Sequence, residues 1–182
     1  MTLDDARRWY ETTKRHLKLF GRVGEKHWND LPWDGALGRD DKLKTLDADA
    51  IVEGVAFCLK HLDDLAILVL FAAFESVVRD RVLSTIEEEI KDERKRQDRP
   101  LVIQVLDDAR QETKRGRILR VLGFFKNQDA GLVEKVNQVR RYRNWVAHGR
   151  RTIRPAAVDP TQAYERLKEF LDRFALSVPD ER

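Results

Sequence analysis

The sequence predicts an all-α fold, an antiparallel helical bundle of about five to seven helices. Charged residues make up 37% of the 182 residues, and there are only nine glycines and five prolines, a composition that favours helices over a β-protein. Apolar residues recur at helical spacing, and no segment alternates in the way typical of strands. The length is sufficient to bury a core, so residues 1–182 are expected to form a single domain.

The N-terminal part predicts one helix and a long connection. The helix is expected over residues 3–20, and residues 21–47 are expected to connect it to the next helix. A connection of this length needs contacts that hold it, and we expect Trp28 and Trp33 to pack it against the bundle. Stacking of the two indoles on nucleobases is the alternative. Residues 1–46 are thus expected to pack on the helical domain.

Acidic residues mark the predicted starts of the central helices. Asp47 or Asp49 is expected to cap a helix that runs toward His61, ahead of the acidic pair Asp63-Asp64. This pair is expected to precede a second, longer helix. The segment 65–74 in that helix is apolar on every side, which is typical of a helix surrounded by others.

The C-terminal half predicts four further helices, over residues 101–112, 117–125, 130–148 and 160–176. Asp129 is expected to cap the third of these, and Gly149 to end it. Asp159 followed by Pro160 is typical of the start of a helix.

The composition also bounds the location and the partners of the chain. The single cysteine, Cys58, excludes an intrachain disulfide and fits a reducing compartment. The charged N-terminus shows no signal peptide, and the longest apolar run is too short to span a bilayer. We therefore expect a cytoplasmic protein without a membrane partner.

Positive charge is concentrated near the C-terminus. The net charge is only +3, yet six arginines fall between Arg140 and Arg154. This local density predicts a focused anion site, and a solvated arginine-rich helix end is the alternative.

The stretch from Arg140 to Arg151 contains groups suited to cutting RNA. Arg143, Asn144 and His148 lie within about one and a half helical turns. A histidine transfers protons near neutral pH, and a guanidinium binds phosphate through a planar fork of donors.

Two charged residues occupy positions on apolar stripes. Arg143 continues the stripe of the helix predicted over 130–148, and Glu75 does so on the long central helix. Because a charge facing a core needs a partner, we expect Glu75 to pair with Arg143. Glu75 then either orients the guanidinium from behind or belongs to a buried ion pair without a catalytic part.

The motif Arg143-Asn144-x-x-x-His148 resembles the Arg-Asn-x-x-x-His signature of the HEPN superfamily, whose members include RNases of toxin-antitoxin and antiviral defence systems. The segment 70–79 also resembles the earlier core helix of that superfamily. The resemblance implies RNA as substrate, a homodimer with the active site at the dimer cleft, and an antitoxin protein as a further partner. Arg143 and His148 would be catalytic and Asn144 supporting. One subgroup carries a modified tyrosine where this chain has Arg150.

The predicted activity is a metal-independent endoribonuclease that leaves 2′,3′-cyclic phosphate ends. Five arginines would bind the flanking phosphates: Arg140, Arg141, Arg150, Arg151 and Arg154. No metal site is expected because His16, His27 and His61 lack ligand spacing, and no cofactor is expected. The alternatives are a non-catalytic HEPN-like module that binds RNA, a nucleotide or a protein, and a purely structural role for Arg143 and His148.

Overall fold

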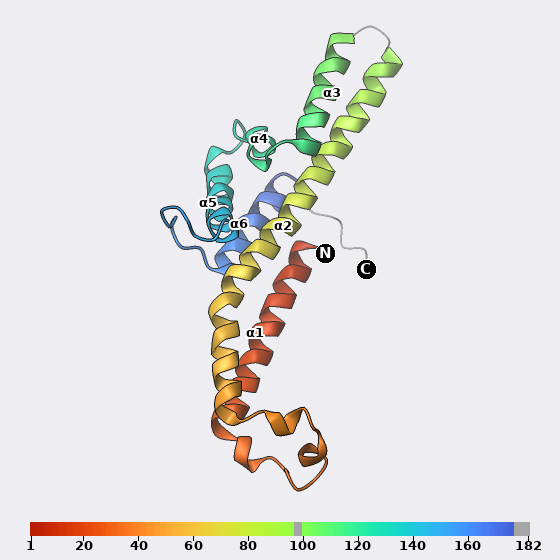
Figure 1. Ribbon diagram of the computed structural model, residues 1–182. Coiled ribbons are helices and arrows are strands. Elements are labelled where there is room, and N and C mark those ends of the chain that lie inside the picture. Colours follow the sequence, from red (N-terminus) through yellow and green to blue (C-terminus); the bar gives the residue numbers. More distant parts are fainter. Residues whose placement is uncertain (97–99, 177–182) are drawn as a thin grey trace. The chain divides into compact units, whose positions relative to one another are not determined.

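The computed structural model describes residues 1–96 and 100–176, and these residues form six α-helices and no strand (Figure 1). The prediction of an all-α bundle with five to seven helices is confirmed. The helices are α1 (Leu3–Lys26), α2 (Ala48–Arg96), α3 (Pro100–Arg115), α4 (Ile118–Gly123), α5 (Ala130–Ala147) and α6 (Pro160–Arg173).

The chain divides into two compact units, and α2 contributes to both. One unit comprises Asp4–Ala66, which we call the N-terminal unit. The other comprises Met1–Leu3 and the chain from Ile67 onward, which we call the C-terminal unit. A single domain over residues 1–182, with residues 1–46 packed on it, stays a prediction.

The N-terminal unit is a hairpin of α1 and the first part of α2. Tyr10 of α1 packs with Leu62 and Ala66 of α2 in a small buried cluster. The Tyr10 hydroxyl donates a hydrogen bond to Asp63 (2.8 Å), and Lys14 donates to both groups. Burial raises the pKa of Tyr10, and the hydrogen bond with Tyr10 raises the pKa of Lys14.

The expected end of the first helix near residue 20 is wrong, because α1 continues to Lys26. Gly21 and Gly24 lie within this helix rather than beyond its end. A Cβ on Gly24 would come within 2.9 Å of Ile51, so the missing side chain permits close packing of α1 on α2. The packing benefit therefore outweighs the low helix propensity of glycine.

The connection is shorter than expected and holds itself together. Between α1 and α2 it contains three short 3₁₀ helices: Trp28–Asp30, Leu37–Arg39 and Leu43–Thr45. The rings of Trp28 and Trp33 lie 4.8 Å apart, and the Trp33 indole donates a hydrogen bond to the Trp28 carbonyl (2.8 Å). Trp28 and Trp33 thus pack against one another, and the packing of both against the bundle stays a prediction.

The expected break at Asp63-Asp64 is wrong, because α2 is one continuous helix of 49 residues. No glycine or proline interrupts it there, and Asp63 is held by the hydrogen bonds from Tyr10 and Lys14. The expected cap is confirmed at Asp47, whose side chain accepts a hydrogen bond from the Ala50 amide (2.6 Å).

Aromatic side chains fill the core of the C-terminal unit. Phe71 and Phe74 of α2 and Phe170 of α6 are fully buried, and the Phe74 and Phe170 rings lie 5.5 Å apart. From α5, Val136 and Val139 complete this core. The expected burial of segment 65–74 on every side is wrong for Leu65, which is 50% exposed, and for Ala72, which is also exposed. Within the described chain, no helix combines the length and apolar character needed to cross a membrane.

Candidate functional site

Helix α5 places the sequence motif at its C-terminal end. Asp129 caps the other end as expected, since its side chain accepts a hydrogen bond from the Leu132 amide (2.9 Å). Along α5 the buried positions lead to Tyr142, and Arg143 follows it at the boundary of the buried face with a side chain that is 32% exposed. Arg143 and Asn144 therefore lie between core and surface, as the sequence predicts, whereas His148 is exposed.

The end of α5 has a defined backbone geometry. Gly149 adopts a left-handed conformation (φ 70°), and its amide donates to the Val146 carbonyl (3.1 Å). The amide of Arg150 donates to the Trp145 carbonyl (2.8 Å). These two bonds form a Schellman motif, the usual reason for a glycine just beyond a helix. The turn fixes where His148 and the following arginines leave α5.

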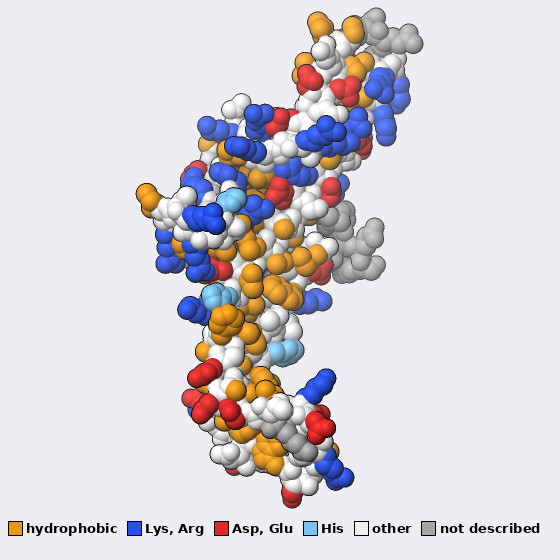
Figure 2. Space-filling view, in the orientation of Figure 1, with side chains coloured by type: hydrophobic (Ala, Val, Ile, Leu, Met, Phe, Trp, Pro, Cys, Tyr) orange, Lys and Arg blue, Asp and Glu red, His pale blue; other side chains and the backbone are white. Residues whose placement is uncertain are grey.

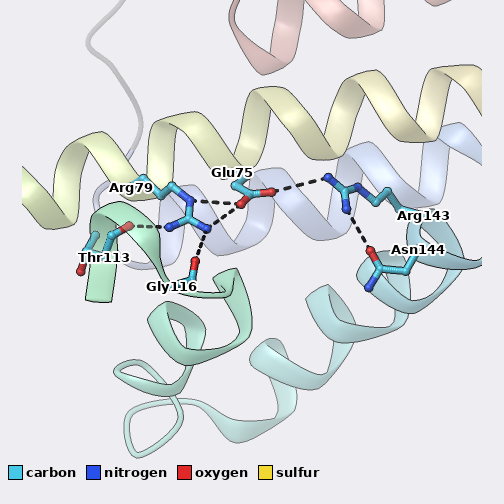
Figure 3. Close-up of polar contacts among 6 residues, drawn as sticks. All are labelled: Glu75, Arg79, Thr113, Gly116, Arg143 and Asn144. Carbon is cyan, nitrogen blue, oxygen red and sulfur yellow. Dashed lines mark hydrogen bonds and ion pairs between the residues drawn. The ribbon is translucent and has the colours of Figure 1, made fainter. Parts of the chain in front are cut away.

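Arg143 contacts three side chains, and Figure 3 draws two of them, Glu75 and Asn144. One guanidinium nitrogen donates to the Asn144 side-chain oxygen (2.9 Å), and another lies 3.8 Å from Glu75 Oε2. The guanidinium carbon lies 5.4 Å from the centre of the Phe71 ring, within the range of a cation–π contact. The predicted Glu75–Arg143 pair is therefore present, although it is longer than a hydrogen bond.

Arg79 is a second arginine that forms an ion pair with Glu75. Its Nε and Nη2 donate to Glu75 Oε1 at 3.0 and 2.7 Å. Arg79 also donates to the carbonyls of Thr113 and Gly116, at the end of α3 and in the turn before α4. Arg79 was not predicted as a site residue, although its position four residues after Glu75 on a helix is the spacing of an ion pair.

His148 stands apart from this network. It is the C-terminal cap of α5, and its backbone amide donates to the Asn144 carbonyl (2.9 Å). Its side chain is exposed, and no hydrogen bond or ion pair joins it to Arg143 or Asn144 in the described part of the chain. The fold brings Glu75, Arg143 and Asn144 together and leaves the His148 imidazole exposed to solvent, four residues after Asn144.

Two of the predicted phosphate-binding arginines, Arg140 and Arg141, belong to α5. Arg140 donates to the Asn137 side chain (3.1 Å), and Arg141 pairs with Glu134. Burial lowers the pKa of Arg140, and the positive charge of Arg141 acts in the same direction. An arginine whose surroundings disfavour its charge gains from a nearby anion.

The segment after α5 is organised by Trp145. The guanidinium carbons of Arg150 and Arg154 lie 5.3 and 5.5 Å from the indole centre. The indole nitrogen donates to the Thr152 carbonyl (3.1 Å). Arg151, which lies between Arg150 and Arg154 in the sequence, is exposed. Figure 2 shows Lys and Arg side chains gathered over α5 and this segment. Trp145, which was not predicted as a site residue, therefore restricts the positions of two of the predicted arginines.

Other features of the C-terminal unit lie away from this site. A cavity of about 630 Å³ is lined mainly by apolar residues, among them Val82 and Ile86 of α2, Phe124 and Phe125, and Phe174 just after α6, and none of the predicted site residues borders it. Among the described residues, no group of three or more His, Cys, Asp and Glu side chains is placed to hold a metal ion.

In comparisons with protein-family models, with curated proteins and with solved structures, nothing matches this chain. The geometry of the site is therefore the basis for a functional proposal.

Proposed function

We propose that this chain is a metal-independent endoribonuclease of the HEPN kind. The observation that carries the proposal is the state of Arg143. Its guanidinium is oriented by Asn144 and lies loosely beside Glu75, yet it remains partly exposed. A guanidinium held in this way is prepared to bind an anion, and the exposed His148 lies at the end of the same helix.

The proposed reaction is attack of a ribose 2′-hydroxyl on the adjacent phosphorus. The bond to the 5′-oxygen breaks, which gives a 2′,3′-cyclic phosphate and a 5′-hydroxyl. One histidine accepts the proton of the 2′-hydroxyl, and a second donates a proton to the departing oxygen. Arg143 stabilises the charge that develops on the phosphoryl oxygens. Because each chain supplies one His148, two chains in a homodimer provide both groups.

The surrounding arginines support binding of a polyanion. Arg150 and Arg154 are held against Trp145, so their positions are restricted before RNA arrives. Together with Arg140, Arg141 and Arg151 they are proposed to bind flanking phosphates, which position the strand without specifying its sequence. The need for a 2′-hydroxyl makes RNA, and not DNA, the proposed substrate. A cytoplasmic role in toxin-antitoxin or antiviral defence, with an antitoxin protein as partner, completes the proposal.

A non-catalytic HEPN-like binding module is the second candidate function. The observation in its favour is His148, whose side chain forms no hydrogen bond or ion pair with Arg143, Asn144 or Glu75 in the described structure. A site that only binds RNA, a nucleotide or a protein needs the arginines but no oriented imidazole.

The test is a cleavage assay with purified wild type, His148→Ala and the control His16→Ala, which changes an exposed histidine of α1. We expect wild type and His16→Ala to cut single-stranded RNA in EDTA and to leave cyclic phosphate ends. Loss of one general acid–base group is expected to slow His148→Ala by about 100-fold or more, with RNA binding retained. Equal cleavage by all three proteins, or cleavage that depends on added magnesium, would contradict the proposed mechanism. Binding without any cleavage would favour the binding module.

A further inference from the structure

Glu75 divides its two carboxylate oxygens between two arginines (Figure 3). Oε1 accepts two hydrogen bonds from Arg79, at 2.7 and 3.0 Å. Oε2 faces Arg143 at 3.8 Å, which is beyond hydrogen-bond distance. Glu75 is thus bound firmly to Arg79 and only loosely to Arg143.

Arg79 is itself held from the opposite side. Its guanidinium donates to the Thr113 carbonyl and, at 2.9 Å, to the Gly116 carbonyl. A guanidinium is a rigid planar fork, so contacts on both sides fix its plane. Its side chain is only 19% exposed, and it cannot follow Glu75 toward Arg143 without giving up these backbone contacts.

The charges of the three residues do not balance. One carboxylate faces two guanidinium groups, which leaves one unit of positive charge. Arg79 is enclosed by backbone carbonyls, whereas Arg143 is the more exposed of the two. The surplus charge is therefore available to a ligand at Arg143.

We infer that Arg79 is a positioning residue that keeps Arg143 open to an anion by holding Glu75 away from it. Without Arg79, the Glu75 carboxylate is free to turn and form a short, two-pronged pair with Arg143. Such a pair neutralises Arg143 and occupies the donors that a phosphate needs. The assignment of that phosphate to an RNA backbone rests on the proposed function, but the competition between Arg79 and Arg143 for Glu75 does not.

The inference is tested with the full chain and a short 2′-O-methyl RNA, which lacks the attacking hydroxyl and so reports binding alone. Fluorescence anisotropy compares wild type, Arg79→Met, Glu75→Gln and the double variant. Arg79→Met is expected to weaken binding by about tenfold, the equivalent of one charge-assisted contact. Glu75→Gln alone is expected not to weaken binding. Adding Glu75→Gln to Arg79→Met is expected to restore binding to within about threefold of wild type, because the competing carboxylate is gone.

Arg120→Met is the matched control, since Arg120 also pairs with a glutamate (Glu112, 2.8 Å) in the C-terminal unit. It removes the same charge without touching Glu75. If folded Arg79→Met binds as well as Arg120→Met, or if Glu75→Gln fails to rescue it, the assignment of Arg79 is overturned. Should Arg79→Met not fold, Arg79→Lys replaces it. One ammonium cannot reproduce contacts on both sides, so weaker binding and rescue by Glu75→Gln are again expected, and their absence overturns the assignment.

Two further measurements separate this inference from the ribonuclease proposal. Inorganic phosphate is titrated against the same variants and followed by the side-chain NMR signal of Arg143, and the same order of affinities is expected. In cleavage assays, Arg79→Met is expected to raise KM more than it lowers kcat. If the variants bind phosphate in the expected order but the wild type cuts no RNA, the ribonuclease proposal is refuted and the role of Arg79 stands. If the Arg79 variants cut and bind RNA like the wild type, the role of Arg79 is refuted and the ribonuclease proposal stands.

Discussion

At the scale of single residues, the contacts of Arg143 are expected to contribute little to the stability of the fold. A structural role would require its loss to leave a buried acid without a partner. Glu75, however, is 23% exposed and keeps both hydrogen bonds from Arg79. A partly exposed pair at 3.8 Å contributes little to the free energy of unfolding.

We therefore expect Arg143→Ala to lower the free energy of unfolding by only about 0–1 kcal/mol while it abolishes RNA cleavage and weakens RNA binding. Arg143→Lys is expected to cleave poorly, because an ammonium lacks the planar fork. Urea unfolding and cleavage are measured on the same preparations, with Arg120→Ala as the control. A loss of about 3–5 kcal/mol with normal activity in the folded fraction would instead assign Arg143 to the architecture.

The pairing of Glu75 with Arg143 was predictable because each residue interrupts an apolar stripe, a pattern that a sequence displays directly. The hydrogen bonds from Arg79 to the backbone were not predictable. Its backbone acceptors, Thr113 and Gly116, lie more than 30 positions away in the sequence, and every residue type has a carbonyl. A contact that any residue can supply leaves no mark in the sequence.

At the scale of helices, the caps were predictable, but the continuity of α2 through residues 63 and 64 was not. Asp47, Asp129 and Asp159 each accept a hydrogen bond from the first turn of the helix that follows. The acidic pair Asp63-Asp64 has the same local chemistry but lies inside α2. There a tertiary contact with Tyr10 and Lys14 satisfies Asp63, so α2 continues through a sequence that resembles a helix start.

Helices α5 and α6 end in the same backbone motif with different residues. Gly149 and Ala175 both have left-handed backbones, with φ of 70° and 50°. In each case the next amide reaches back to the last turn of the helix, from Arg150 to Trp145 and from Leu176 to Leu171, both at 2.8 Å. Glycine adopts this conformation without strain, whereas alanine does not.

Exchanging the two residue types is expected to change stability in opposite directions. Gly149→Ala is expected to destabilise the protein by about 1 kcal/mol, and Ala175→Gly to stabilise it by up to about 1 kcal/mol. Gly131→Ala is the control, because Gly131 lies within α5 with van der Waals room for a Cβ and should be neutral or stabilising. Urea unfolding measures all three. Equal effects of Gly149→Ala and Gly131→Ala would show that φ does not decide the cost.

At the scale of the whole molecule, the uneven distribution of charge has a consequence for the proposed binding of RNA. A net charge of +3 produces little general attraction for polyanions, but six arginines near the end of α5 produce a local positive field. Binding to RNA should therefore be salt-dependent, and the contacts should be confined to this part of the chain.

The proposed chemistry also demands two proton-transfer groups, and each chain offers one His148. Large apolar side chains are exposed on several helices, among them Phe57 (68%), Leu101 (76%) and Val105 (67%), and such surfaces are available for association. The mechanism therefore requires a homodimer in which two copies of the motif share one cleft.

Sedimentation equilibrium at micromolar concentration is expected to give twice the chain mass of 21.3 kDa. Mixing wild-type and variant chains tests whether the two chains of the dimer share one active site. If one cleft needs both copies of His148, refolding wild type with an excess of His148→Ala chains should suppress activity beyond simple dilution, because each mixed dimer keeps a single proton-transfer group. The same excess of His16→Ala chains should leave activity undiminished. A strict monomer that cleaves RNA, or activity that falls only in proportion to dilution, would show that each chain completes the reaction by itself.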